Sequence, residues 1–347
     1  MKKEESGDSE SIHSATDTAI GDLKCVPELW FEDDNLTLRA EDSIFRISKG
    51  FLAARPPVLK TMFSALSHPS AGMLYGCPIL ELPHASVDVT NFLKAIFNLE
   101  YVATATRELQ SRHYPTVFFM PPPARAPFSV VIAVLALAHE YGVASLLKRA
   151  LLHLETFFPI TLDGARNYDA PAEGSGMSML SCDLIALQAA SDVGASWCLP
   201  SIIYECCTFS LAELLDNTHW HALPACHKRT LLLAHAAQKR GVSTVTRFLF
   251  VASPTGCRSA AKCNTARLLW LDVVDAWRAT GRDSVPLEFW DDSDWGNMDD
   301  QFCDPCLTRF QTSYAQAREV LWTGLPRMYG LHGWDALNKM RAEVFVA

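Results

Sequence analysis

Cysteine is distributed unevenly along this chain, and the distribution indicates two halves that are built differently. Of 11 cysteines in 347 residues, Cys25 and Cys77 lie in the first half, and the other nine lie after residue 180. Between these halves, residues 159–180 contain two prolines and a Gly-Ser-Gly triplet, which favour a linker. The predicted organisation is a disordered tail at 1–24, a first domain at 25–158, a linker at 159–180 and a Cys-rich helical domain at 181–347.

The N-terminal residues and the overall charge limit the cellular compartments and the classes of partner that we expect for this protein. Acidic, Ser and Thr residues dominate positions 1–22, which lack the apolar core of a secretory signal. The longest apolar run, at 130–138, has nine residues, whereas a membrane-spanning helix needs about 20. The formal net charge of −9 disfavours nucleic acid, because phosphate contacts need a basic surface. We therefore expect an intracellular protein, cytoplasmic or nuclear, that binds neither membranes nor nucleic acid.

Local patterns in the first domain predict a sheet followed by helices. Residues 36–39 and 45–48 alternate apolar and polar side chains around a turn at 41–43, which predicts a pair of strands. A third strand is expected at 77–82. Helical spacing is found at 59–66, 86–97, 130–141 and 143–154, and a Pro-rich loop at 103–128 has room for an edge strand at 114–120. The predicted fold class is α+β, followed by a mostly α-helical second half.

Short motifs in this order of elements resemble a known domain. They are Phe45-Arg46-Ile47-Ser48, Leu52-Ala53, Met62-Phe63, Gly76-Cys77-Pro78, the helix at 89–97, the Pro-rich connection at 121–131 and the stretch at 137–150. On these residues, the segment 36–158 is similar to a BTB/POZ domain, in the divergent form abundant in fungal proteins. The second half, including residues 325–331, is similar to the helical extension of such proteins.

The resemblance implies a mixed sheet with packed helices and a non-enzymatic function in binding other proteins, as a scaffold or adaptor. Homodimer formation and the role of substrate adaptor on a cullin scaffold of a ubiquitin ligase both stay open. Ser48 stands where the family usually has His, and Pro56-Pro57 where it usually has Ser, which bears on cullin binding. The chain also lacks the common nucleotide-binding, zinc-protease and hydrolase signatures, so we expect no enzyme.

Four cysteines of the second half have the spacing of a structural metal site. Five residues separate Cys257 from Cys263, and two separate Cys303 from Cys306. Four thiolates suit a tetrahedral Zn²⁺, although the first gap exceeds the usual spacing of about two to four residues. Such a site is not catalytic, because four protein ligands leave no open position. The alternatives are buried cysteines without a metal, and a zinc-stabilised helical module with an unrecognised enzymatic role.

Two other groups of potential ligands are predicted to be structural. They are the histidine cluster His219, His221, Cys226 and His227, and the pair Cys206-Cys207. A turn at Leu223-Pro224 interrupts the first group, which favours solvated or capping histidines over metal ligands. Apolar neighbours of the cysteine pair predict buried packing thiols.

An acidic stretch extends from residue 283 to residue 304. It contains eight acidic residues and neither Lys nor Arg, with Trp290 and Trp295 interleaved. This composition favours a solvated acidic loop. The alternative is an acidic and aromatic contact surface for a basic partner.

Overall fold

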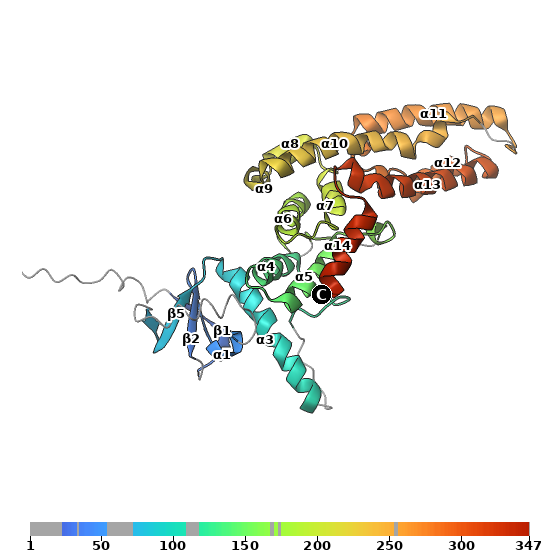
Figure 1. Ribbon diagram of the computed structural model, residues 1–347. Coiled ribbons are helices and arrows are strands. Elements are labelled where there is room, and N and C mark those ends of the chain that lie inside the picture. Colours follow the sequence, from blue (N-terminus) through green and yellow to red (C-terminus); the bar gives the residue numbers. More distant parts are fainter. Residues whose placement is uncertain are drawn as a thin grey trace, which may run out of the picture. The chain divides into compact units, whose positions relative to one another are not determined.

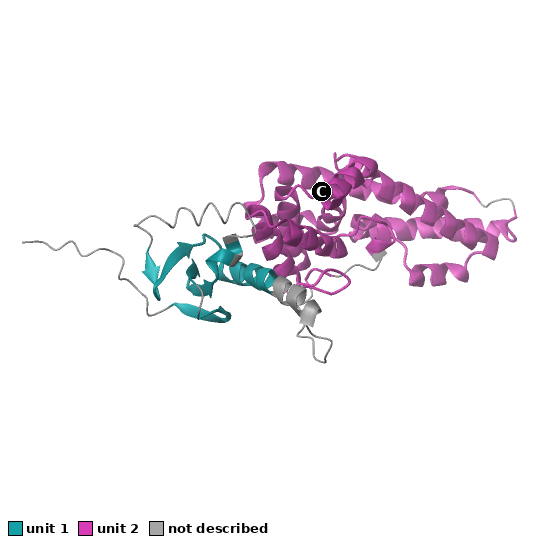
Figure 2. Ribbon diagram, turned by 60° about the horizontal axis from the view of Figure 1, so that its bottom comes forward, with its two compact units in different colours: residues 1–101 teal, residues 102–347 magenta. Residues whose placement is uncertain are grey.

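The computed structural model describes residues 23–32, 35–53, 72–108, 118–166, 170–172, 175–252 and 256–346 (Figure 1). They belong to two compact units, residues 1–101 and 102–347 (Figure 2). The helix predicted at 59–66, the Pro56-Pro57 departure and nearly all of the tail at 1–24 lie outside the described residues. Of the edge strand predicted at 114–120, the described residues 118–120 form a turn instead.

In the described part of the first unit, five strands form one mixed sheet. They are β1 (Lys24–Trp30), β2 (Leu36–Ala40), β3 (Ser43–Ile47), β4 (Met73–Leu74) and β5 (Cys77–Glu81), in the order β1-β3-β2-β5-β4. The antiparallel pairing of β2 with β3 confirms the strand pair predicted from alternation. Because β1 runs parallel to β3 and β5 parallel to β2, the sheet is mixed, as predicted.

Two helices accompany this sheet, α1 (Lys49–Ala53) and α3 (Ser86–Glu108). The buried face of α3 has the i, i+3, i+4, i+7 spacing predicted for it, through Val89, Phe92, Leu93 and Ile96. At the start of α3, the Ser86 backbone N–H donates to Glu41 Oε2 at 2.9 Å, which satisfies one of the free donors of the helix terminus. Further along, Phe97 packs against Phe31, with ring centroids 5.4 Å apart.

The second unit is built from helices, which confirms the mostly α-helical second half. They are α4 (Phe128–Glu140), α5 (Ala144–Phe157), α6 (Met179–Asp192), α7 (Leu199–Cys206), α8 (Leu211–Asp216), α9 (Thr218–Ala222), α10 (Ala225–Val245), α11 (Ala260–Ala279), α12 (Asp292–Asp299), α13 (Asp304–Met328) and α14 (Trp334–Val346). Helix α4 packs against both α5 and α6, so α4 and α5 group with the helices that follow them. The domain boundary predicted at 158 therefore differs from the boundary between the compact units, and it stays a prediction.

An aromatic core forms where α11 and α13 meet the segments between them. Trp290 is 4% exposed, and its ring centroid lies 5.3–5.8 Å from those of Phe248, Trp270, Trp277, Phe289 and Trp295. The Arg282 guanidinium lies over the Trp277 ring, 3.9 Å from its centroid, a cation–π contact. Aromatic packing thus fixes the α11 and α13 region that carries the candidate site.

Candidate metal centre

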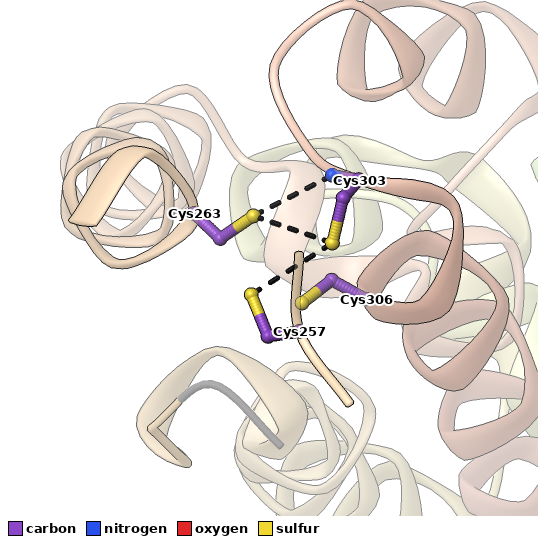
Figure 3. Close-up of side chains that lie close together, drawn as sticks. All are labelled: Cys257, Cys263, Cys303 and Cys306. Atoms are coloured by element: carbon purple, nitrogen blue, oxygen red, sulfur yellow. Dashed lines mark hydrogen bonds between the residues drawn. The ribbon is translucent and has the colours of Figure 1, made fainter. Parts of the chain in front are cut away.

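Four cysteine side chains converge at the N-terminal ends of α11 and α13. Cys263 lies in the first turn of α11 and Cys306 in the first turn of α13, while Cys303 precedes α13 and Cys257 lies in the loop before α11. Their four Sγ atoms all lie within 4.8 Å of one another (Figure 3). The structure therefore brings together the four cysteines that the sequence spacing selected, in a cluster able to hold a metal ion.

The distances within the cluster match those of a tetrahedral thiolate site. Cys303 Sγ lies 3.7 Å from both Cys257 Sγ and Cys263 Sγ. Ligands at a Zn–S distance of about 2.3 Å, placed at the corners of a tetrahedron, are about 3.8 Å apart. Two of the sulfur–sulfur separations thus match the spacing that a bound Zn²⁺ would impose, and the others are at most 4.8 Å.

Helix starts explain why these residues meet. Cys303 occupies the N-cap position of α13, and the Cys306 backbone N–H donates to the Cys303 carbonyl oxygen at 2.8 Å. A proline in the first turn, Pro305, has the fixed φ that suits a helix start. The N-terminal end of a helix carries a partial positive charge, which stabilises thiolates. The start of α13 therefore favours the deprotonated form of Cys303, its N-cap residue.

The surroundings of Cys263, Cys303 and Cys306 shift their pKa values, and the four cysteines differ in exposure. Burial raises the pKa of Cys263 and of Cys306, and both side chains are buried. Burial also acts to raise the pKa of Cys303, but hydrogen bonds from the backbone N–H groups of Arg258 and Cys306 and from the thiols of Cys263 and Cys306 together lower that pKa to about 6. Cys303 and Cys257 are each partly exposed. A metal ion would thus have a path from solvent on one side of the cluster.

Positive side chains near the cluster are engaged with oxygen atoms of the same region. Arg258 Nη1 lies 2.8 Å from Asp304 Oδ2, in an exposed ion pair beside Cys257 and Cys303. Lys262 Nζ donates to the Asp300 carbonyl oxygen at 2.9 Å. The first contact joins the loop before α11 to the start of α13, and the second joins the first turn of α11 to the end of α12.

The other sequence candidates form no comparable cluster. Among the described residues, no second group of three or more His, Cys, Asp or Glu ligand atoms gathers in this way. Cys226 and His221 are exposed, and His219 is partly exposed on α9. Cys206 and Cys207 are fully buried, as predicted for packing thiols.

The acidic stretch is neither a loop nor a flat contact surface at its centre. Asp291 and Asp294 form a reciprocal capping box at the start of α12, and Asp294 is 5% exposed and pairs with Arg282. Trp290 is buried, and Trp295 packs against it and against Tyr314. The favoured prediction of a solvated acidic loop was wrong at this point, and the alternative of an acidic and aromatic contact surface does not hold for Trp290, which is buried, whereas Trp295 is partly exposed.

Sequence reasoning missed the backbone donors at the cluster, the N–H groups of Arg258 and Cys306. Their signal is the placement of Cys303 two residues before Pro305, since proline marks a helix start and its free N–H groups.

In comparisons with family models, curated proteins and solved structures, no match to this chain was found. None of the described helices is long and apolar enough to cross a bilayer.

Proposed function

We propose that this protein is a non-enzymatic protein–protein interaction module, a BTB-type scaffold or adaptor, with a structural Zn²⁺ in its helical unit. The observation that carries the zinc proposal is the set of four Sγ atoms within 4.8 Å, with two separations of 3.7 Å. Cys257, Cys263, Cys303 and Cys306 would fill all four positions around the ion. The ion therefore stabilises structure and performs no chemistry.

The zinc ion would add four bonds to the contacts that already link the loop before α11 with the start of α13. Cys257 lies in a loop that follows Gly256, whose φ of +97° suits glycine, and Cys303 lies in the connection between α12 and α13. Binding the ion releases part of its free energy as folding free energy, because the ligands are not assembled in the unfolded chain. We expect the metal to order the start of α11 against the start of α13.

The interaction role draws on the first unit. Its hairpin β2–β3, followed by α1, the parallel strand β5 and then α3, has the element order that the BTB/POZ resemblance implies. Large apolar side chains are exposed at its β4–β5 edge, where Met73 is 64% and Tyr75 is 54% exposed. Exposed apolar side chains at a sheet edge favour contact with another protein.

A reducing compartment suits both parts of the proposal. All eleven cysteines, each among the described residues, are free thiols. Thiolates stay available for a metal where glutathione keeps them reduced, which is the case in the cytoplasm and nucleus. We place the proposed function in one of these compartments.

Metal analysis of the purified full-length protein tests the zinc proposal. Mass spectrometry should find one zinc per chain in the wild type and in Cys226→Ser, whose cysteine is exposed and outside the cluster. Cys303→Ser should lose most of the zinc while circular dichroism still shows a helical protein. Zinc absent from the wild type, or retained equally by Cys303→Ser, would contradict the proposal.

Proximity labelling in native cells tests the interaction role. The full-length chain fused to a labelling enzyme should enrich a reproducible set of proteins over the enzyme alone. Met73→Asp, which places a charge on the exposed β4–β5 edge, should deplete part of that set. A set no larger than that of the enzyme alone would reject the interaction role and leave the zinc proposal intact.

A further inference from the structure

A groove of about 590 Å³ lies between α4, α6 and α9 of the second unit. Its apolar lining comes from three segments that are distant in sequence: Ile132, Ala136, Leu184, Ile185, Ala189 and Leu223. Leu184 and Leu223 are buried, whereas Ala136 and Ala222 are exposed, so the groove is open to solvent. Its volume falls within the range of about 300–1,000 Å³ that is common for ligand sites.

Small side chains create this groove. Ala136 on α4, Ala189 on α6 and Ala222 on α9 stand where longer apolar residues would fill the space. Along α6, lining residues recur one turn apart, from Leu184 through Gln188 to Asp192. Along α4, Ile132 and Ala136 have the same spacing. Helices α4 and α6 thus each line the groove with a stripe of residues spaced one turn apart.

Each stripe ends in a carboxylate. Glu140 is the last residue of α4 and Asp192 the last of α6, and both are exposed and line the groove. The C-terminal end of a helix is already partly negative, so helix stability does not explain carboxylates there. Gln188 Nε2 donates to Asp192 Oδ1 at 2.6 Å and orients that carboxylate.

The charge of the groove determines what suits it. Among the described residues, its lining holds no Lys or Arg, and its other titratable groups are His139 and His219. The groove is therefore apolar with a negative rim at neutral pH. An occupant with apolar side chains and a cation complements both features. Residues 1–22 of this chain do not fit, because they carry six acidic residues against two lysines.

We propose that this groove binds an amphipathic segment of another protein, with apolar side chains one turn apart and a Lys or Arg beside them. The apolar side chains occupy the space above Leu184 and Leu223, and the cation pairs with Asp192. A helix that lays its apolar face into a groove is a recurring mode of peptide recognition. This inference rests on the proposed interaction role and gives that role a specific surface and partner chemistry.

Synthetic peptides of defined sequence test the proposal on the full-length, zinc-loaded protein. Three helical peptides of roughly 15 residues carry the same two leucines one turn apart and differ in one flanking residue, Lys, Gln or Glu. Fluorescence anisotropy should show saturable binding of the Lys peptide, about tenfold tighter than the Glu peptide, with Gln between them. Asp192→Asn keeps the acceptor for Gln188 and should reduce the preference for Lys.

A substitution that blocks the groove, compared with a matched control elsewhere, tests where the peptide binds. Ala136→Trp fills the groove from an exposed position and should weaken the Lys peptide at least about tenfold. Ala236→Trp, at an exposed position of α10 outside the lining, should leave binding unchanged. Equal melting temperatures of the two variants would show that folding is not the cause.

Three results would overturn the proposal: no saturable binding up to about 1 mM peptide, equal affinity for all three peptides, or full binding by Ala136→Trp. If the peptides fail while proximity labelling still finds partners, the groove alone is rejected. If labelling finds none, the interaction role is rejected.

Discussion

Asp183 on α6 is a buried carboxyl whose replacement by asparagine should stabilise the protein. Its side chain is 1% exposed, and neither carboxylate oxygen has a hydrogen-bond partner among the described residues. Burial, with a contribution from Glu205, raises the pKa of Asp183 well above its usual range. A buried polar group without a partner costs about 1–3 kcal/mol, and more when it is charged. Asparagine keeps the shape and cannot ionise, so it removes the cost of the charge alone; we expect a gain of at least about 1.4 kcal/mol at pH 7, the equivalent of one unit of raised pKa.

The protonation of Asp183 in the folded and unfolded states determines how the stability difference changes with pH. Below its unfolded pKa, Asp183 is protonated in both states and contributes no pH dependence to stability. As the pH rises, the unfolded chain releases the proton first, so stability falls by about 1.4 kcal/mol per pH unit until the folded pKa is reached. The advantage of Asp183→Asn should therefore be small near pH 4, grow as the pH rises and then level off.

Thermal unfolding followed by circular dichroism, from about pH 5 to pH 8, measures this difference. For a unit of this size, about 1 kcal/mol corresponds to about 2–4 °C in Tm. Asp272→Asn, which removes an exposed carboxyl from α11, is the control and should change stability by less than about 0.5 kcal/mol. A lower Tm for Asp183→Asn, or a difference that is constant across this pH range, would refute the reasoning.

Two further substitutions test the packing of the helical unit. Arg341 pairs with Glu155 through two contacts of 2.6 and 2.8 Å, and Glu155 also accepts from Trp197 Nε1. Arg341→Ala should lower stability by about 1–3 kcal/mol and speed tryptic cleavage of α14, whereas unchanged cleavage would contradict the role of this pair. Trp290→Ala empties the centre of the aromatic core and should lower stability by about 3–5 kcal/mol in urea unfolding, and a loss below about 1 kcal/mol would argue against it.

Features that depend on local pattern were predictable from the sequence. The β2–β3 pair follows from alternation around the turn at 41–43, and the buried face of α3 follows from the spacing of its apolar residues. The four cysteines could be selected because short spacings within each pair are a chemical requirement of a metal site. Their convergence was not predictable from the spacings, because it depends on how the start of α11 packs against the start of α13, about 40 residues further along the chain.

Features set by contacts distant in sequence were not predictable. β1 contains Pro27, lacks alternation and owes its conformation to parallel pairing with β3. The acidic stretch was misread because the cation that compensates Asp294 is Arg282, which lies before the stretch and is held over Trp277. The groove had no local signal at all, because its lining comes from three helices.

X-ray absorption at the zinc edge of the purified full-length protein tests the central claim most directly. We expect a single shell of four sulfur atoms at about 2.3 Å, which Cys226→Ser should reproduce. A sample without a zinc edge, or a first shell dominated by nitrogen or oxygen at about 2.0 Å, would contradict the assignment of Cys257, Cys263, Cys303 and Cys306 as the ligands.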